Sequence, residues 1–84
     1  MKNLRALLAD RDMQILQFQK RLSSHKHQLL NAGKETTMGA SRDSIYRWIK
    51  GGYVSEDSLK EVAYVLSNIP LLDGSLVKVE PEDL

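Results

Sequence analysis

The sequence predicts a small, mainly α-helical domain of four to five helices, and three observations support this prediction. Residues 3–30 contain neither proline nor glycine, the two residues that most often interrupt a helix. Ser41 and Ser55 each precede a run of apolar residues at helical spacing, and serine is a favoured N-cap. The 84 residues, of which 42% are hydrophobic, leave room for one small core.

The first helical region has apolar residues at alternating spacings of four and three, which places them on one helix face. This face, termed the N-terminal stripe, consists of Leu4, Leu8, Ile15, Phe18, Leu22 and Leu29, with Arg11 and His25 at its remaining positions and Leu7 and Leu16 beside it. In one arrangement, a helix over residues 3–22 breaks at Ser23 and Ser24 and a second helix follows over residues 25–32. In another, a single long helix runs to residue 32 and the stripe is a dimer seam.

A third arrangement places the break earlier in the chain. Asp10 and Asp12 can cap helix ends near Met13, which gives three short helices before residue 33. We favour a break over one long helix, because a globular core requires the leucines of the N-terminal stripe to converge.

Residues 41–52 form the most clearly delimited helix of the sequence. The Ser41 hydroxyl can accept a free backbone N–H of the first turn, and Gly51 and Gly52 supply the positive φ that ends a helix. The apolar face of this helix consists of Ile45, Trp48 and Ile49. The other positions are Arg42, Asp43, Tyr46, Arg47 and Lys50. One face can therefore pack against a core while the other contacts a ligand.

Residues 38–51 and 55–66 together resemble the second half of a Cro/repressor-type helix-turn-helix domain. That family has a glycine in the turn, a serine that opens the recognition helix, hydrophobic residues within it and a glycine that closes it. The matching positions are Gly39, Ser41, Ile45, Trp48 and Gly51. The resemblance implies a sequence-specific DNA-binding transcriptional regulator, similar to a phage Cro repressor, that binds a pseudo-palindromic operator as a homodimer.

The chain departs from the family before the recognition helix. The family has a small residue four positions before the turn glycine, preceded by an apolar residue, whereas this chain has Glu35 and Lys34 there. We therefore expect the supporting helix to end near Ala32 and a longer connection to follow over residues 33–40.

The residue types of the polar face predict how DNA would be contacted. Arginine pairs with guanine through two hydrogen bonds, and serine, tyrosine and lysine commonly bond phosphates or base edges. The predicted base contacts are Ser41, Arg42, Asp43, Tyr46 and Arg47. The predicted phosphate contacts are Lys26, Lys34, Thr36, Thr37 and Lys50.

The charge is divided unevenly along the chain. Residues 1–53 contain ten Lys or Arg and four Asp or Glu, a balance of +6, whereas residues 54–84 contain two and seven, a balance of −5. The basic half includes the predicted recognition helix, as attraction to phosphate requires, and the acidic half is expected to face away from DNA.

The last third of the chain predicts one more helix and a tail. Ser55 opens a helix with acidic residues in its first turn and apolar residues at helical spacing up to Leu66. Beyond it, Asp73 and Gly74 separate two short extended runs, which predicts a short C-terminal β-hairpin. We expect it to pack on the helices or to pair with a second chain, since a C-terminal β element takes part in dimerisation in Cro repressors. The predicted division is a helix-turn-helix domain over residues 1–68 and a tail over residues 69–84.

Several classes of protein are disfavoured by what the sequence lacks. There is no cysteine, His25 and His27 would point to different faces of a helix, and no phosphate-binding loop is present, so we expect no enzyme, metal or cofactor. The sequence has neither an apolar run of ~20 residues nor a signal-peptide core, which favours a cytoplasmic protein without membrane contact. The alternative function is a protein-interaction module, such as an antirepressor or antitoxin-like protein, that uses the N-terminal stripe.

Overall fold

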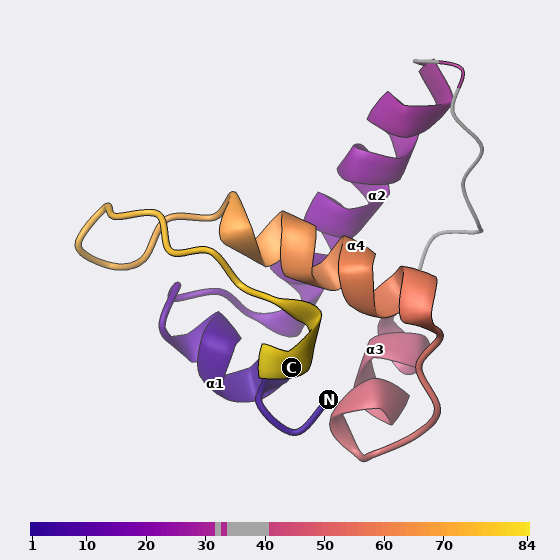
Figure 1. Cartoon of the computed structure of the whole chain (residues 1–84), viewed down its shortest axis with the longest axis horizontal. Coiled ribbons are helices and arrows are strands. Elements are labelled where there is room, and N and C mark those ends of the chain that lie inside the picture. The colour runs from indigo at the N-terminus through magenta and orange to yellow at the C-terminus, as the bar shows by residue number, and fades with distance from the viewer. Residues whose placement is uncertain (32, 34–40) are drawn as a thin grey trace.

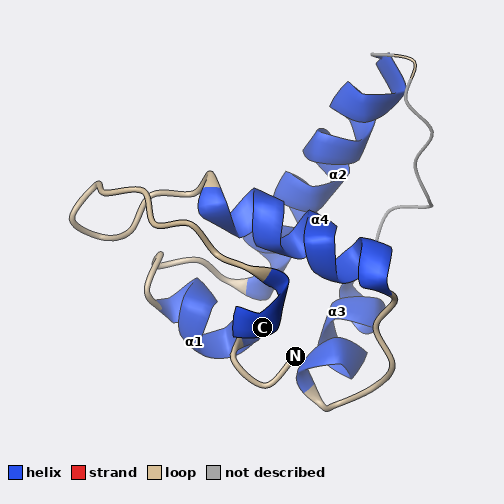
Figure 2. Ribbon diagram, viewed as in Figure 1, coloured by secondary structure: helices blue, strands red, loops and turns tan. Residues whose placement is uncertain are grey.

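Four α-helices and one short 3-10 helix form the fold in the computed structural model, which describes residues 1–31, 33 and 41–84 (Figure 1). They are α1 (Leu4–Ala9), α2 (Ile15–Asn31), α3 (Arg42–Ile49), α4 (Glu56–Ser67) and η1 (Pro81–Asp83). No strand occurs within this described part of the chain (Figure 2). The predicted mainly α-helical class with four helices is confirmed.

The long helix α2 packs mainly against two other helices. It contacts α3 and α4, and α4 in turn contacts η1 near the end of the chain (Figure 1). The buried apolar side chains come from all four helices and from the tail, and they form one core: Leu4, Leu8, Phe18, Leu22, Ile45, Val62, Ala63, Val65, Leu66, Ile69, Val79 and Leu84. One continuous core therefore joins the N-terminal half of the chain to its acidic tail.

The break in the N-terminal region lies near Met13, as in the third predicted arrangement, but it separates two helices, so the predicted three short helices are wrong. The backbone N–H of Met13 donates to Leu8 and that of Asp12 to Ala9, both at 3.0 Å, and Asp12 has a φ of 50°. This pair of hydrogen bonds around a left-handed residue is the Schellman end of a helix. The expected break at Ser23 and Ser24 is wrong, since α2 runs through both residues.

Arg11 explains why a charged residue occupies a position of the N-terminal stripe. Its side chain is buried, and its Nε donates to the carbonyl of Leu66 at 3.1 Å while a terminal nitrogen donates to the carbonyl of Leu7 at 2.9 Å. Both acceptors lie in the last turns of helices, where carbonyl groups lack partners within the helix. Arg11 therefore connects the ends of α1 and α4.

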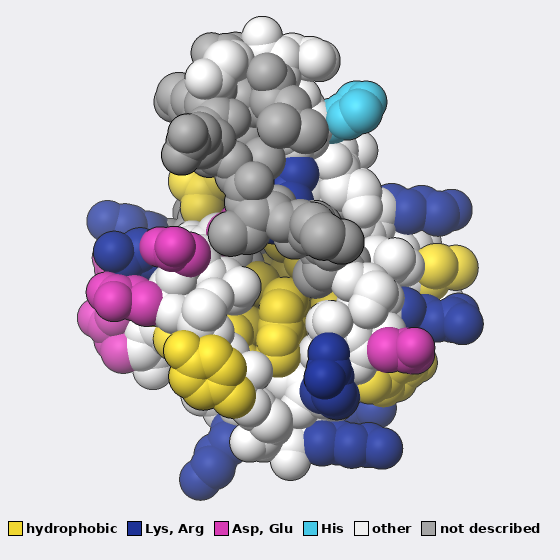
Figure 3. All heavy atoms as spheres, turned by 90° about the vertical axis from the view of Figure 1, so that its right-hand side faces the viewer, with side chains coloured by type: hydrophobic (Ala, Val, Ile, Leu, Met, Phe, Trp, Pro, Cys, Tyr) yellow, Lys and Arg dark blue, Asp and Glu magenta, His cyan; other side chains and the backbone are white. Residues whose placement is uncertain are grey.

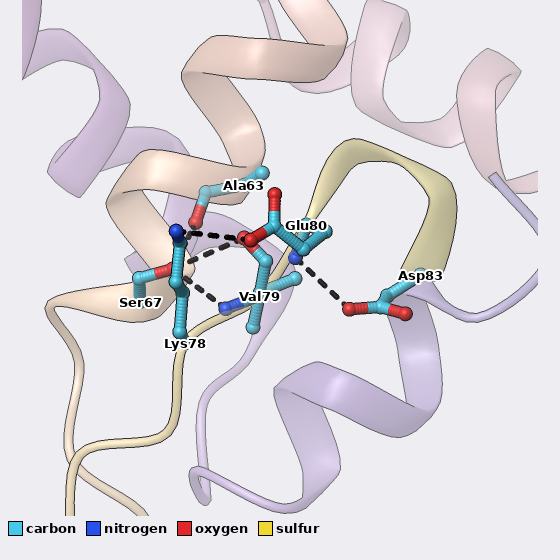
Figure 4. A network of polar contacts seen from close by, with 6 residues as sticks. All are labelled: Ala63, Ser67, Lys78, Val79, Glu80 and Asp83. Carbon is cyan, nitrogen blue, oxygen red and sulfur yellow. Dashed lines mark hydrogen bonds and ion pairs between the residues drawn. The ribbon is translucent and has the colours of Figure 1, made fainter.

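The predicted C-terminal hairpin is wrong, although its turn forms. Leu71 donates its N–H to Ser75 at 2.9 Å around Gly74, whose φ is 85°. The second arm then leaves the first and binds α4. The Ser67 hydroxyl donates to the carbonyl of Ala63 at 2.7 Å and accepts the N–H of Val79 at 2.8 Å (Figure 4). The backbone N–H of Val79 thus pairs with a helix side chain, which anchors the arm to α4.

The two ends of the chain lie close together (Figure 1). Asn3 donates its backbone N–H to Leu84 at 3.1 Å and its side-chain amide to the carbonyl of Asp83 at 2.9 Å. The tail therefore returns to the start of α1, and η1 holds it there. None of the described helices has the length and apolar character needed to cross a membrane.

Candidate nucleic-acid interface

Helix α3 is closed at both ends by the residues that the sequence predicts. The Ser41 hydroxyl accepts the N–H of Ser44 at 3.2 Å, and Gly51 takes a φ of 95° at the other end. Gly52 donates to the carbonyl of Arg47 at 2.8 Å, and a Cβ on Gly52 would lie 2.9 Å from the same oxygen. A side chain is therefore excluded at Gly52 by close approach, and one at Gly51 would be strained by conformation.

The amino terminus adds a charged contact at the end of α3. The Met1 ammonium donates to the carbonyl of Trp48 at 2.8 Å. A positive charge at the C-terminal end of a helix complements the helix dipole and satisfies a free carbonyl. This contact fixes the end of α3 against the segment that precedes α1.

The division of α3 into a packing face and an exposed face is confirmed. Ile45 is fully buried, and Trp48 and Ile49 are partly buried against the core. The exposed residues at the start of α3 and along it are Ser41, Arg42, Asp43, Tyr46, Arg47 and Lys50. All five predicted base contacts and Lys50 therefore lie at the protein surface.

Hydrogen bonds within the first turn of α3 orient part of this exposed face. The hydroxyl groups of Ser41 and Ser44 lie 3.1 Å apart, and a terminal nitrogen of Arg47 donates to the Ser44 hydroxyl at 3.3 Å. The Arg47 guanidinium has further donors that remain available for an acceptor outside the protein. In Figure 3 most basic side chains lie along the lower and right margins of one face, and acidic side chains lie mainly at its left, next to further basic ones.

Two further polar residues lie beside α3 that the sequence did not indicate. Arg5 of α1 and Gln14, which precedes α2, line one groove together with Arg42 and Tyr46. The fold alone brings them together, because they are distant in sequence and Arg5 and Gln14 match no motif. They enlarge the polar surface around the start of α3.

Lys26 is buried, whereas its predicted role as a phosphate contact requires an exposed side chain. Only 8% of it is exposed, and its ammonium nitrogen lies 3.5 Å from a carboxylate oxygen of Glu61 on α4. A buried ion pair is costly to separate, so Lys26 contributes to packing between α2 and α4 rather than to the exposed surface. Of the remaining predicted phosphate contacts, Lys50 is exposed, and Lys34, Thr36 and Thr37 lie outside the described residues.

The region around His25 likewise contains contacts between helices. The rings of His25 and Tyr64 lie 5.0 Å apart at an angle of 37°, on α2 and α4. Among the described residues, no group of three His, Cys, Asp or Glu side chains is arranged to hold a metal ion.

Comparison with known proteins gives no relative for this chain. No protein-family model, no curated protein and no solved structure matches it. The exposed face of α3 and the residues around it are therefore the features from which a function can be inferred.

Proposed function

We propose that the protein is a sequence-specific DNA-binding transcriptional regulator that uses α3 as its recognition helix. The observation that supports this most directly is the arrangement of α3. Ile45 anchors the helix in the core, while Arg42, Tyr46 and Arg47 are directed to solvent. Each arginine can donate two parallel hydrogen bonds, and the tyrosine hydroxyl can donate one. Side chains with such donors recognise base edges in the major groove.

The dimensions of α3 suit this role. An α-helix with its side chains is about 10–12 Å in diameter, and the major groove of B-DNA is about 12 Å wide. We assign Lys50, the C-cap of the helix, to contact with a phosphate, and Arg5, which lines the same groove as Arg42, supplies a further positive charge. No cofactor or metal is required for this binding, and a cytoplasmic location fits the role.

One short helix offers few base contacts, so we propose that the protein binds a pseudo-palindromic operator as a homodimer. The half-site centres should then lie about one helical turn, ~34 Å, apart. The tail has an exposed apolar surface at Leu72, Leu76 and Val77 that suits contact with a second chain. Sedimentation at micromolar concentration should show a dimer, and a protein that is monomeric both free and on DNA would contradict this part of the proposal.

Selection of bound duplexes from random DNA tests the function directly. We expect an enriched palindrome, and an affinity that falls steeply with salt because bound phosphates release counterions. Arg47→Ala should weaken binding to the enriched site, whereas Arg21→Ala on the exposed surface of α2 is the matched control. A library that shows no enrichment at low salt would refute the proposal.

The protein-interaction alternative is less well supported. Leu4, Leu8, Phe18 and Leu22 of the N-terminal stripe are buried in the core of the same chain. These side chains are therefore not available to hold a helix of another protein. An apolar complex would also keep its affinity as salt rises, so the salt series separates the two functions.

A further inference from the structure

An open groove runs between α1, the start of α2 and the start of α3. Its volume is about 690 Å³, which lies within the range of ~300–1,000 Å³ typical of ligand sites. Met13, Ile15 and Leu16 contribute apolar surface to it, and Arg5, Arg42 and Tyr46 also line it. The groove thus combines residues of the N-terminal region with two residues of the proposed DNA-reading face.

The apolar part of the groove is exposed to water. Leu16 is 45% exposed and Tyr46 is 38% exposed, although both are large apolar side chains. Contact with apolar surface does not stabilise a bound phosphate. Binding of DNA would therefore explain the two arginines but would leave the Leu16 side chain exposed to water. An apolar side chain placed here would remove this surface from water.

The charges around the groove all have one sign. Arg5 and Arg42 line it, and no Asp or Glu is among its lining residues. Neither guanidinium forms an ion pair with any residue that the structure describes. Asp12 and Asp43 are close in sequence but do not line the groove. Apolar surface together with two guanidinium groups that have no ion pair among the described residues is complementary to an apolar side chain flanked by carboxylates.

We propose that this groove binds a short segment of a partner protein in which a large apolar side chain is flanked by acidic residues. An open groove suits a peptide segment better than a small molecule, which requires burial of most of its surface. The further consequence rests on the proposed function. Because Arg42 and Tyr46 belong both to the groove and to the reading face, the bound segment and DNA exclude each other.

A library of displayed random peptides, selected for binding to the full chain in the absence of DNA, tests whether the groove binds such a segment. We expect enriched peptides that contain an aromatic or large aliphatic residue beside Asp or Glu. Leu16→Asp places a carboxylate in the groove and should weaken binding of the enriched peptide about tenfold or more. Leu16 is the second residue of α2, where an acidic side chain favours the helix, so the fold is preserved.

Tyr53→Asp provides the matched control, since Tyr53 is an exposed apolar side chain outside the groove and the change in charge is the same. It should leave peptide affinity unchanged. Arg5→Ala should weaken binding and reduce its salt dependence, whereas Arg21→Ala should do neither. Enriched peptides without acidic residues, or peptides that bind Leu16→Asp as tightly as the original protein, would overturn the proposal. Self-association that is abolished by Leu16→Asp would also overturn it, because a second copy would then occupy the groove.

A competition measurement separates this proposal from the proposed function. If the enriched peptide binds the groove but the protein selects no DNA, the function is refuted and the docking site remains. If DNA is selected and no peptide is enriched, the docking site is refuted and the function remains. Release of selected DNA by the enriched peptide would support both.

Discussion

Arg11 donates its Nε–H to the carbonyl of Leu66 at 3.1 Å and thereby joins the α1–α2 junction to the last turn of α4. The guanidinium is buried, and its two hydrogen-bond acceptors are backbone carbonyls at helix ends. A residue that interrupts an apolar stripe in the sequence is thus a connection between helices in the fold.

Arg11→Met should destabilise the protein by about 1–3 kcal/mol, because the side-chain volume is largely kept while the hydrogen bonds from Arg11 to the Leu66 and Leu7 carbonyls are lost. The midpoint of urea unfolding measures this change. Arg21→Met replaces an exposed arginine on α2 and should shift the midpoint little. Equal midpoints for the two variants would show that the Arg11 hydrogen bonds add nothing to stability.

Ile45→Ala should cost about 2–5 kcal/mol, since Ile45 is fully buried and its truncation leaves a cavity in a small core. Its neighbour Tyr46 lies on the exposed side of α3, and Tyr46→Ala should change stability by only about 0.5 kcal/mol. Thermal unfolding followed by circular dichroism checks both values. A larger loss for Tyr46→Ala would mean that the two faces of α3 are assigned the wrong way round.

Arg42→Ala and Arg47→Ala should each cost about 1–3 kcal/mol on the selected DNA site and relax base preference at one position. Lys50→Ala should instead weaken all sequences about equally and lower the salt slope by about one unit per subunit. Arg47→Lys should not restore binding, because lysine cannot form the planar pair of hydrogen bonds. Binding of each variant to single-base changes of the site provides the measurement. If neither arginine substitution alters the base preference at any position, both arginines contact phosphate.

Asp73 should titrate below its ordinary value. The Ser75 hydroxyl donates to the Asp73 carboxylate at 2.6 Å and the Ser75 N–H at 2.9 Å, and these bonds lower the pKa of Asp73 below 3.8. A lowered pKa stabilises the turn above pH 3.8, and this contribution is lost as the pH falls through the folded-state pKa. Carboxyl chemical shifts measured during an acid titration report this pKa. Ser75→Ala should raise it, and an unchanged value would exclude the hydroxyl as its cause.

Local signals predicted α3 and α4 well. Ser41 and Ser55 each accept the N–H three residues later, as serine N-caps do, and Gly51 takes the left-handed conformation that ends α3. Such signals depend on neighbouring residues only, so the sequence is sufficient to place them. The apolar spacing of α3 likewise predicted which face would be buried.

Contacts between distant residues could not be predicted in this way. Arg5 and Arg42 line one groove only because the fold brings α1 and α3, which are distant in sequence, to the start of α2. The predicted hairpin failed for a related reason, since the N–H of Val79 bonds to Ser67 of α4. Ser23 and Ser24 did not end α2, which shows that packing of a long helix outweighs the weak helix preference of serine.

The hydrogen bond between Asn3 and Leu84 closes the backbone into a near-complete ring. Closing so long a loop is entropically unfavourable, and the bond forms only once the intervening helices have shortened the path between its ends. The Asn3 amide should therefore become protected late in refolding and exchange with solvent early in native conditions, ahead of the amides of α2. We therefore expect local unfolding of this small domain to begin at the contact between Asn3 and Leu84.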